Sequence, residues 1–472
     1  MGSGQVTDWQ GKNVTVAGLG VSGVPAAKVL HGLGANVTVV NDGDDTRARE
    51  QAAELRALGV TVRLGDGATL PEGAELIVTA PGWKPDKPLF TAAREAGVPV
   101  WGDVELAWRL RGPDAAPWLC VTGTNGKTTT TQMLASILKA AGLRTAAVGN
   151  IGVSLLDAVL GEERYDVLAV ELSSYQLHWA PSLRAHSAAV LNLAPDHLDW
   201  HGSMEAYAKD KGRVYEGNRV ACVYNVADKA TEDLVREADV EEGCRAIGFT
   251  LGAPAPSQLG VVDGILVDRA FVADRQKNAQ ELAEVSDVNP PAPHNIANAL
   301  AAAALARAFG VPPKAVRDGL RAFTPDAHRI ALVADLDGVA YVDDSKATNT
   351  HAAEASLAAY ESIVWIAGGL AKGATFDELV AKSAKRLRGV VLIGADRALI
   401  HEALTRHAPE VPVVDLDRTD TGAMLAAVQE ARRLAVEGDT VLLAPACASM
   451  DMFVNYNQRG DAFAQAVGEL GT

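Results

Sequence analysis

The chain has 472 residues, a length that predicts two or three domains rather than one. Hydrophobic residues make up 48% of it and aromatic residues only 5%, a balance typical of aliphatic helices packed on parallel strands. The formal net charge of −16, with no block of Lys and Arg, argues against a nucleic-acid-binding protein. The four cysteines lack metal-ligand spacing, and the sequence holds neither a signal-peptide pattern nor an apolar run of membrane-spanning length. We therefore expect a soluble cytoplasmic protein of enzyme size, with reduced thiols, that binds neither nucleic acid nor membrane.

The first stretch of the chain has the pattern of a nucleotide-binding α/β unit. A predicted strand over 13–17 runs into Gly18-Leu-Gly-Val-Ser-Gly23 and a helix, and a second strand over 36–40 ends at Asp42. The glycines satisfy G-x-G-x-x-G, whose tight turn brings backbone N–H groups to a diphosphate, while the acidic residue suits a ribose. The same pattern serves NAD and UDP-sugars, so these residues alone leave a dinucleotide-dependent dehydrogenase open.

Further α/β elements complete this unit. A strand over 76–80 stops at Pro81-Gly82-Trp83, and helices are predicted around 48–58 and 88–96. Residues 111–117, rich in Pro and Gly, have the composition of a linker. The first domain is therefore expected over residues 1–113.

The second domain opens with a candidate phosphate site. A buried strand is predicted over 118–121, a glycine loop follows, and a helix is predicted over 129–141. In this layout the loop N–H groups and the helix N-terminus attract phosphate, Lys127 adds a full positive charge, and the Thr128 hydroxyl can reach a magnesium ion. The strict pattern G-x-x-x-x-G-K-[ST] is not met, because its leading glycine would fall at Val121.

Carboxylates and imidazoles follow the next two predicted strands of this domain. The strand over 165–170 ends in Glu171, and the strand over 188–193 runs into Ala194-Pro-Asp-His-Leu-Asp-Trp-His201. A carboxylate at a strand end beside a phosphate loop is where a magnesium ligand belongs. The second histidine of that segment receives no assignment.

The end of the second domain combines hairpins with an Ala-rich helix. Residues 249–292 are rich in Gly, Pro and Asp, and their short apolar pieces predict hairpin strands. The helix that opens at Pro293 carries Asn295 and Asn298 three positions apart, on one face. The domain is expected over 114–324.

The third domain, expected over 325–472, repeats the strand-to-polar-loop pattern three times. A strand over 339–342 breaks into Asp343-Asp-Ser-Lys-Ala-Thr-Asn349, one over 362–367 leads to Lys372, and one over 440–444 leads to Ser449. Such residues gather at the carboxyl edge of a sheet, where doubly wound sheets bind ligands. We also expect Ser449 to cap the last helix.

Four of these segments resemble motifs of the Mur ligase family. They are T-G-T-N-G-K-T-T, E-L-S-S-Y-Q-L, D-S-K-A-T-N and S-M-D-M-F-V-N-Y-N-Q-R-G, which begin at Thr122, Glu171, Asp344 and Ser449. The first is also similar to the ATP loop of folylpolyglutamate synthases, and the last resembles the family members that add D-glutamate. The resemblance implies a three-domain α/β architecture: an N-terminal Rossmann-like domain for the UDP-substrate, a central P-loop ATPase-type domain, and a C-terminal Rossmann-like domain for the incoming amino acid.

The resemblance also implies an activity and a set of site residues. The activity is that of an ATP-dependent acid–D-amino-acid ligase, which adds D-glutamate to UDP-N-acetylmuramoyl-L-alanine through an acyl phosphate in peptidoglycan precursor synthesis. The implied ATP contacts are Gly123, Thr124, Asn125, Gly126, Lys127, Thr128, Thr129, Asn295, Asn298, Arg329 and Asp344. The implied UDP-substrate contacts are Gly20, Val21, Ser22, Asp42, Pro81, Gly82, Asn150, Ser173 and His197. The implied D-glutamate contacts are Lys346, Thr348, Lys372, Ser449 and Tyr456. The implied metal ligands are Thr128, Glu171, His197 and Lys211, and the implied catalytic residues are Lys127, Lys211, His197 and Lys346.

Two of these roles compete with ordinary structural ones. In the family a lysine four residues after a tyrosine carries a carbamate, and that spacing from Tyr207 selects Lys211 over Lys209. An unperturbed lysine amine has a pKa of about 10.4, so carbamate formation needs surroundings that favour the neutral amine. The alternative for Lys211 is a surface ion pair with Asp210, and the alternative for Asn150 is a helix cap.

The implied cofactors are ATP and Mg²⁺, with two ions expected and a carbamylated lysine at position 211. We expect a monomer whose partners are its small-molecule substrates. The alternatives are another Mur ligase, a folylpolyglutamate synthase-like ligase and, more remotely, an NAD-dependent dehydrogenase. A folylpolyglutamate synthase would not need the first domain, and a dehydrogenase would leave the phosphate loop and D-S-K-A-T-N unused.

Overall fold

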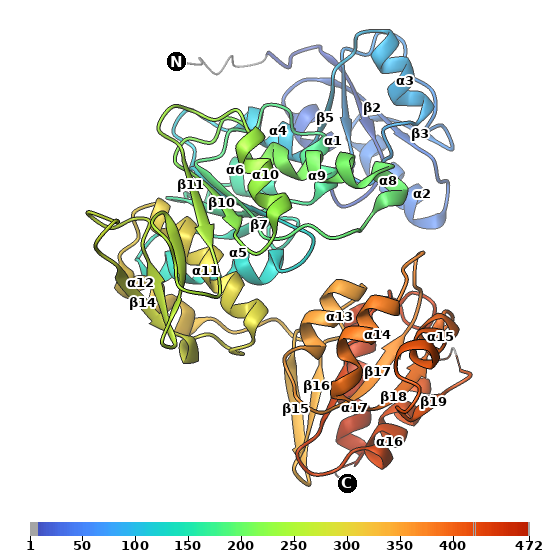
Figure 1. Cartoon of the computed structure of the whole chain (residues 1–472). Coiled ribbons are helices and arrows are strands. Elements are labelled where there is room, and N and C mark those ends of the chain that lie inside the picture. The colour runs from blue at the N-terminus through green and yellow to red at the C-terminus, as the bar shows by residue number, and fades with distance from the viewer. Residues whose placement is uncertain (1–7, 419, 421, 471–472) are drawn as a thin grey trace. The chain divides into compact units, whose positions relative to one another are not determined.

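A computed structural model describes residues 8–418, 420 and 422–470 of the chain (Figure 1). The chain divides into two compact units: residues as far as Val288 together with Ile296–Phe323, and Asn289–Asn295 together with the residues from Thr324 onward. The first unit holds two sheets and the second holds one. Each sheet lies within one of the three expected domain ranges, and the boundaries near residues 113 and 324 stay predictions.

The first sheet is fully parallel, in the order β3-β2-β1-β4-β5. Its strands are β1 (Asn13–Ala17), β2 (Asn36–Asn41), β3 (Thr61–Leu64), β4 (Leu76–Thr79) and β5 (Val100–Gly102). Its helices are α1 (Gly23–Gly32), α2 (Thr46–Ala57), α3 (Pro88–Glu95) and α4 (Asp103–Leu110). From β1 the strand order proceeds to β2 and β3 on one side and to β4 and β5 on the other. The glycine loop after β1 therefore lies at the topological switch point, where such sheets bind ligands.

The central sheet has nine strands in the order β14-β13-β12-β11-β10-β9-β6-β8-β7. They are β6 (Trp118–Thr122), β7 (Ala147–Gly149), β8 (Leu168–Glu171), β9 (Ser187–Val190), β10 (Ala221–Asn225), β11 (Arg245–Phe249), β12 (Gln258–Val262), β13 (Ile265–Asp268) and β14 (Gln280–Glu284). The strands from β7 to β12 pair in parallel, and β12, β13 and β14 form the antiparallel hairpins expected from their short apolar pieces. The strand of the phosphate loop, β6, therefore lies between β8 and β9.

Eight α-helices and two short 3-10 turns accompany the central sheet among the described residues. They are α5 (Lys127–Ala140), α6 (Leu155–Leu160), α7 (Ser174–His178), α8 (Leu198–His201), α9 (Met204–Gly212), α10 (Lys229–Glu237), α11 (Pro293–Ala308), α12 (Pro313–Ala322), η1 (Arg213–Tyr215) and η2 (Val285–Asp287). Helix α5 begins two residues earlier than predicted, which places Lys127 and Thr128 in its first turn.

The third sheet has the order β15-β16-β20-β17-β18-β19, and only β15 runs antiparallel to its neighbour. Its strands are β15 (Ala331–Leu336), β16 (Val339–Asp343), β17 (Ile363–Gly368), β18 (Leu387–Ile393), β19 (Val413–Asp415) and β20 (Thr440–Leu443). Its helices are α13 (Thr350–Leu357), α14 (Asp377–Ser383), α15 (Arg397–His407), α16 (Ala423–Leu434) and α17 (Tyr456–Leu470), with a 3-10 turn, η3 (Ala384–Arg386).

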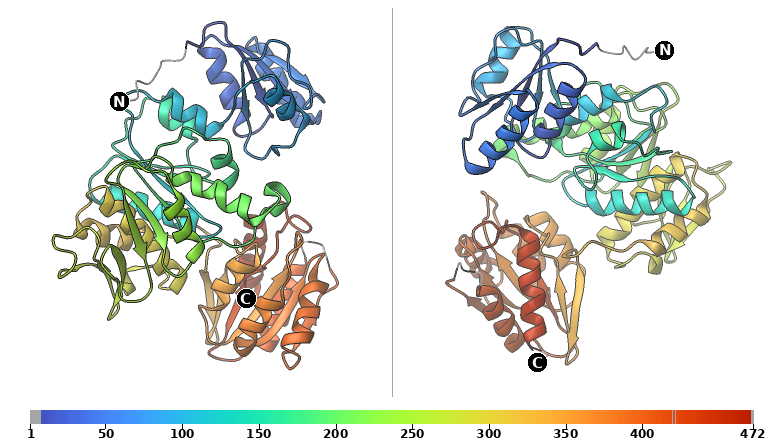
Figure 2. Two further views of the ribbon diagram at one scale, coloured as in Figure 1. Left: turned by 45° about the horizontal axis from the view of Figure 1, so that its top comes forward. Right: turned by 180° about the vertical axis from the view of Figure 1, so that it is seen from behind.

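Helices cover both faces of the third sheet (Figure 2). Successive residues of β17 point to opposite faces: Trp365 packs with α13, α14 and α15, whereas Ile366 packs with α16 and α17. Both side chains are fully buried, which explains why this strand is apolar at every position. The doubly wound α/β fold class predicted from the sequence is confirmed.

One local prediction is wrong. Ser449 does not cap the last helix, because α17 begins only at Tyr456. The side chain of Asn455 accepts a hydrogen bond from the backbone N–H of Gln458 (3.0 Å) and does the capping instead. The carbonyl of Ser449 accepts from the N–H groups of Met452 and Phe453, so this serine starts a separate turn.

Candidate active site

The phosphate loop is built by two glycines in left-handed conformations between β6 and α5. Gly123 has φ +148° and Gly126 has φ +82°, values that side chains with a Cβ rarely adopt. The loop therefore turns sharply enough for the first N–H groups of α5 to point into the space that the loop encloses. Lys127 Nζ donates to the carbonyls of Gly123 (3.0 Å) and Thr124 (2.9 Å), so its charge lies over the loop.

The loop is anchored by residues that the sequence did not single out. Asn125 N donates to Asn192 Oδ1 (2.9 Å), and Asn192 Nδ2 donates back to the Asn125 carbonyl (3.1 Å). Thr124 Oγ1 is hydrogen bonded to the hydroxyl of Tyr207 (2.9 Å) and to the backbone of Ala194. The Thr124 N–H also donates to the Asn192 carbonyl (2.9 Å), so both the side chain and the backbone of Thr124 fasten the loop to the segment after β9.

Gly126 packs directly against Asn298, so a larger residue at position 126 should disrupt nucleotide binding. A Cβ on Gly126 would lie 2.4 Å from Asn298 Oδ1, and the positive φ adds backbone strain. We expect Gly126→Ala to weaken ATP binding at least about tenfold, since a strain of one to three kcal/mol must be relieved by moving the loop. Calorimetric titration with ATP measures this. Gly142→Ala, at an open site after α5 with a similar φ of +80°, is the matched control and should leave the affinity unchanged.

Glu171 provides a buried carboxylate next to the loop. It ends β8, pairs in register with Val121 of β6, and is 1% exposed. Its Oε1 accepts a hydrogen bond from Asn150 Nδ2 (2.8 Å), whereas Oε2 has no hydrogen-bond partner among the residues that the structure describes. A buried carboxylate oxygen without a donor is costly unless a cation or another ligand group meets it, so this side chain fits a metal ligand.

Asn150 does not cap a helix. Ser154 caps α6 through its own side chain, while Asn150 is held by Glu171 through both its side chain and its N–H. The helix-cap alternative for Asn150 is therefore wrong, and its amide lies beside the candidate metal ligand.

Lys211 is buried in the same place. Its side chain is 2% exposed, Nζ donates to the Gly123 carbonyl (2.7 Å), and Nζ lies 4.7 Å from the centre of the Tyr207 ring. Burial holds the pKa of Lys211 well below its ordinary value of 10.5, and the positive charge of Lys127 lowers it further. The amine is thus shifted toward its neutral, nucleophilic form.

The surface ion pair between Lys211 and Asp210 is absent from the described structure, so that alternative is wrong. Asp210 points away and accepts from His178 Nδ1 (2.8 Å) and His201 Nδ1 (3.0 Å). Arg213 adds an ion pair at 3.2 Å, and the hydrogen bonds from the two histidines lower the pKa of Asp210 to about 2 although its burial opposes this. The unassigned histidine, His201, uses its other nitrogen on Ser174 Oγ (3.0 Å) and is a structural residue.

His197 lies at the start of α8, in a left-handed conformation with φ +54°. Its ring is half-exposed, packs 4.9 Å from the centre of Tyr175, and lies 3.5 Å from the carboxylate of Asp196. Burial lowers the pKa of His197, and the Asp196 charge opposes that shift. A neutral imidazole that reaches solvent from the loop after β9 could serve as a ligand or as a substrate contact.

In the first domain the glycine loop is held by Asn41, the residue before the predicted substrate contact Asp42. Leu19 N donates to Asn41 Oδ1 (3.0 Å), while the next residue, Asp42, forms an ion pair with Lys87. Ser22 donates to Asp103 Oδ2 (3.0 Å), and Val21 is 84% exposed in the loop.

The Pro81-Gly82 turn contacts the central domain. Trp200 Nε1 donates to the Gly82 carbonyl (3.2 Å), and Lys84 Nζ donates to the Asp199 carbonyl (2.8 Å). The segment that carries His197 is therefore hydrogen bonded to the turn after β4, and two predicted UDP-substrate elements from different sheets come together.

The second unit collects its predicted residues at the carboxyl ends of three neighbouring strands, β16, β20 and β17. Lys346 Nζ lies 4.0 Å from the centre of the Tyr456 ring, which places two predicted D-glutamate contacts side by side. The buried guanidinium of Arg459 donates to the carbonyls of Ser345 (2.8 Å) and Cys447 (3.1 Å), which holds the loop after β16 next to the loop after β20.

Lys372 and Ser449 are linked through the loops that carry them. Leu370 and Ala448 exchange two backbone hydrogen bonds of 2.9 Å, which join the loop after β17 to the loop after β20. Lys372 is exposed with φ +50°, and Ser449 is 4% exposed. Thr348 N donates to the Lys346 carbonyl (2.8 Å) in the turn before α13.

Asp344 should make the stability of the protein depend on pH. It is buried, accepts from Ser356 Oγ, and its burial raises its pKa from 3.8 to about 6, against the opposing charge of Arg329. The stability that this raised pKa contributes is complete below pH about 4 and is lost as the pH rises through about 6. Asp344→Asn, which cannot ionise, should therefore gain roughly 1 to 3 kcal/mol over the parent at pH 8 and little at pH 4.5. Thermal melting at both pH values measures this, and an equal gain at both would contradict it.

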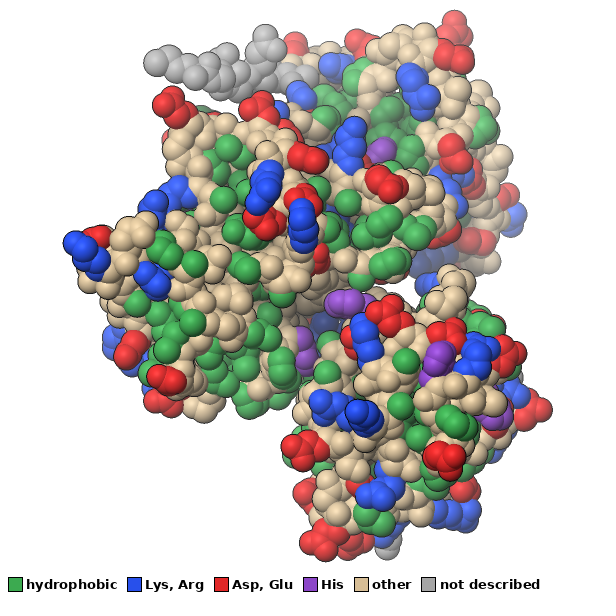
Figure 3. All heavy atoms as spheres, in the orientation of Figure 1, with side chains coloured by type: hydrophobic (Ala, Val, Ile, Leu, Met, Phe, Trp, Pro, Cys, Tyr) green, Lys and Arg blue, Asp and Glu red, His purple; other side chains and the backbone are tan. Residues whose placement is uncertain are grey.

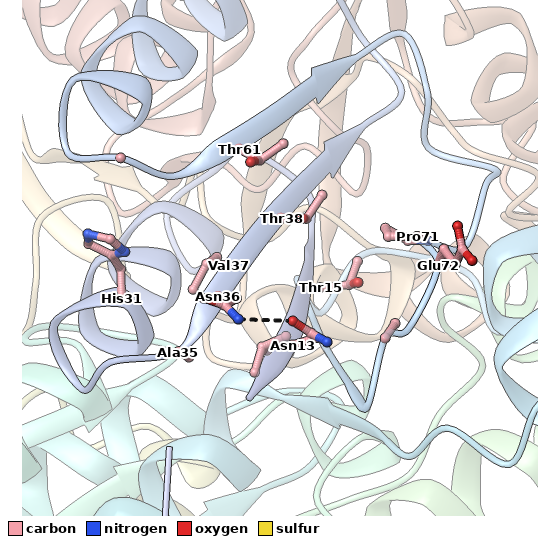
Figure 4. A pocket seen from close by; sticks show the side chains of 13 residues that line it. Asn13, Thr15, His31, Ala35, Asn36, Val37, Thr38, Thr61, Pro71 and Glu72 are labelled. Carbon is pink, nitrogen blue, oxygen red and sulfur yellow. Dashed lines mark hydrogen bonds between the residues drawn. The ribbon is translucent and has the colours of Figure 1, made fainter. Parts of the chain in front are cut away.

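Outside these sites, a hollow of about 200 Å³ lies at the amino ends of β1, β2 and β3 (Figure 4). Asn36 Nδ2 donates to Asn13 Oδ1 (3.1 Å) across it, and His31 and Thr61 also line it. It opens at the edge of the sheet opposite to the glycine loop and brings together no predicted site residue. On the face shown in Figure 3, acidic and basic side chains are interspersed.

Comparison with known proteins identifies the family to which this chain belongs. Family models match three successive stretches: the Mur ligase MurD-like N-terminal domain at 12–102, the Mur ligase middle domain at 121–306, and the Mur ligase glutamate ligase domain at 328–447. The UDP-N-acetylmuramoylalanine–D-glutamate ligase of Streptomyces avermitilis is 88% identical over 99% of this chain and all of its own length. The chain belongs to the Mur ligase family.

Two further comparisons extend this result. The Streptomyces coelicolor protein of the same name is 89% identical over 98% of this chain and 99% of its own length. The crystal structure of UDP-N-acetylmuramate–alanine ligase from Thermotoga maritima has a TM-score of 0.54 at 18% identity, over 97% of this chain and 99% of that one, and shares the Mur ligase fold. Among the described residues no helix is both long and apolar enough to cross a membrane.

Proposed function

We propose that this chain is the ligase that joins D-glutamate to UDP-N-acetylmuramoyl-L-alanine with cleavage of ATP to ADP and phosphate. The observation that carries the proposal is whole-length identity of 88% and 89% to two proteins named for this activity. The folylpolyglutamate synthase and dehydrogenase alternatives are not favoured, because the first domain matches a MurD-like model and the chain carries a phosphate loop.

The chemistry requires activation of a carboxylate, which is a poor electrophile. The γ-phosphoryl group of ATP passes to the alanyl carboxylate, the bond to the β-phosphate oxygen breaks, and an acyl phosphate forms. The amine of D-glutamate then attacks the acyl carbon, loses a proton, and phosphate leaves from the tetrahedral intermediate. Two anionic groups must approach each other in the first step, so offsetting negative charge is the main task of the site.

The phosphate loop is the part of the chain suited to that task. The N–H groups in the first turn of α5 would face anionic oxygens, and Lys127 would add a full positive charge once its amine leaves the loop carbonyls. Asn298, in contact with Gly126, supports the nucleotide side of this site together with Asn295 on the same helix. Arg329 and Asp344, which belong to the second unit, are proposed as further nucleotide contacts.

Magnesium fits the donor set of the central domain. Two ions are proposed, and their ligands would be Thr128, His197, a carbamate on Lys211 and the Glu171 oxygen that has no hydrogen-bond partner among the described residues. Bound Mg²⁺ would supply electrostatic stabilisation of the charge crowded between the γ-phosphate and the carboxylate.

The surroundings of the Lys211 amine support the proposed carbamate. The lone pair of neutral Nζ attacks the carbon of carbon dioxide, a C–N bond forms, and the displaced proton leaves to solvent. The product is an anion with two oxygens in place of a cation, which would relieve the repulsion between Lys211 and Lys127. A buried lysine with a depressed pKa is the residue on which this reaction is favoured.

Sites are also proposed for the two remaining substrates. The glycine loop and the Pro81-Gly82 turn are proposed to hold the UDP-substrate with Asn150 and Ser173, and Lys346, Thr348, Lys372, Ser449 and Tyr456 to hold D-glutamate. We further propose that the enzyme is cytoplasmic and acts as a monomer in peptidoglycan precursor synthesis.

An isotope experiment tests the proposed route. With both oxygens of the alanyl carboxylate labelled with ¹⁸O, the acyl-phosphate route places one labelled oxygen in the released phosphate and retains one in the amide. Mass spectrometry of both products measures this. Unlabelled phosphate alongside a correctly formed amide would exclude the acyl phosphate.

A further inference from the structure

Helix α4, which the sequence did not predict, begins at the junction between the first sheet and the central domain. Gly102, the last residue of β5, donates its N–H to the Trp179 carbonyl (2.8 Å). A Cβ on Gly102 would lie 2.9 Å from Trp179 Cβ, so the two backbones are in close contact here. Asp103, the first residue of α4, is therefore held at a fixed place between two domains of the same unit.

The carboxylate of Asp103 contacts both domains. Its Oδ2 accepts from Ser22 Oγ (3.0 Å) in the glycine loop and from Gln176 Nε2 (3.5 Å) in α7. Its Oδ1 accepts from Val104 N (2.9 Å) at the start of its own helix. Both oxygens are thus used as acceptors, which a carboxylate can provide and an amide cannot.

The second partner, Gln176, leads directly to another predicted substrate contact. Gln176 Oε1 accepts from the N–H and from the hydroxyl of Ser173, both at 3.1 Å, and Gln176 N donates to Ser173 Oγ (3.2 Å). This reciprocal capping box fixes the start of α7. Asp103 therefore links Ser22 and Ser173, one on each side of the proposed UDP-substrate site.

Holding a carboxylate here has an energetic cost that the surrounding donors oppose. Burial raises the pKa of Asp103, and the hydrogen bonds from Ser22, Val104 and Gln176 lower it. The N-terminus of α4 also favours the negative charge. The single hydroxyl proton of Ser22 is committed to this carboxylate, so the Ser22 hydroxyl acts here as a link to Asp103 and not as a donor to the diphosphate.

We propose that Asp103 is a positioning residue for the UDP-substrate: it sets the spacing between the glycine loop and the start of α7 through Ser22 and Gln176. The inference rests on the proposed function. It predicts a defect confined to one substrate, because ATP and D-glutamate are assigned to other elements.

A neighbouring carboxylate on the same helix supplies the matched control. Glu105 is buried and also joins α4 to the central domain, through the N–H of Ser182 (2.9 Å) and the hydroxyl of that serine. Neither Ser182 nor Glu105 is a proposed substrate contact. Glu105→Gln should therefore disturb the same domain junction without moving the two substrate loops.

The experiment compares Asp103→Asn, Glu105→Gln and the parent in steady-state ligation and thermal melting. For Asp103→Asn we expect KM for UDP-N-acetylmuramoyl-L-alanine to rise about tenfold, since a hydrogen bond to a charged group is lost, with kcat and the other two KM values changed less than about threefold. Glu105→Gln should lower the melting temperature and leave every KM within about twofold of the parent.

Variants of Ser22 test the link from the other side. Ser22→Ala should raise the KM for UDP-N-acetylmuramoyl-L-alanine, and Ser22→Thr should restore it. The KM of the double variant, Ser22→Ala with Asp103→Asn, should be no higher than that of the more impaired single variant.

Each contrary result overturns the inference. These are an unchanged KM in folded Asp103→Asn, an equal rise in Glu105→Gln, a joint rise of all three KM values, or additive effects in the double variant. If Asp103→Asn does not fold, an unchanged KM in Ser22→Ala overturns it by itself. Absence of UDP-substrate-dependent turnover in the parent would instead overturn the proposed function, and this inference with it.

Discussion

Lys211→Arg should lower kcat at least about a thousandfold, because arginine keeps the charge and the length of the side chain but cannot form a carbamate. Arginine stays protonated in the buried site where the lysine amine is shifted toward neutrality. A fixed cation would remain beside Lys127, at the place where two anionic oxygens are proposed. Steady-state ADP release with all three substrates measures the loss.

Lys209→Arg is the control for this change. Lys209 lies on the same helix, α9, two residues away, and is exposed, so its replacement should leave kcat unchanged. The carbamate itself can be detected on the parent by carbon NMR in the presence of ¹³C-labelled bicarbonate, with the signal absent from Lys211→Arg. An active Lys211→Arg enzyme would show that the carbamate is not needed.

The second large effect is expected at the phosphate loop. Lys127→Ala should reduce kcat roughly a thousandfold, because it removes the full positive charge at the γ-phosphate. The Lys127 Nζ contacts with the Gly123 and Thr124 carbonyls show that the amine already lies over the loop mouth. Single-turnover measurement with ATP in excess separates this loss of rate from weaker ATP binding.

Lys139→Ala, in the last turn of the same helix, is the control. Lys139 is exposed at the opposite end of α5, where its charge is far from the loop. Both variants remove one lysine from one helix, so a general effect of charge or helix stability would appear in both. Comparable losses of kcat in the two variants would show that Lys127 has no specific role in the reaction.

The sequence predicted the local structure around the candidate site where backbone geometry requires one residue type. Gly123 and Gly126 have positive φ angles, and Glu171 ends a buried strand beside the loop, so spacing and residue type were sufficient. The parallel order of the sheets then brings the loops after β6, β8 and β9 together. The family resemblance added roles to residues whose positions the strand pattern already implied.

The sequence did not predict the residues that hold the site through hydrogen bonds to distant parts of the chain. Asn192, Asn41 and Asp103 have no distinctive spacing from their partners, which lie 67, 22 and 81 positions away in the chain. Helix α4 was missed because it follows β5 and precedes the predicted linker with no residue between them. Lys211 and Asp210 are adjacent, and only tertiary packing shows that the lysine faces the loop while the aspartate faces His178 and His201.

The most direct test of the central claim is ADP release with ATP, Mg²⁺ and UDP-N-acetylmuramoyl-L-alanine, compared with D-glutamate, L-glutamate or no amino acid. We predict sustained turnover only with D-glutamate, and none when the UDP-substrate is omitted. Turnover that is independent of the UDP-substrate would contradict the role of the first domain, and equal turnover with L-glutamate would contradict the proposed D-glutamate site.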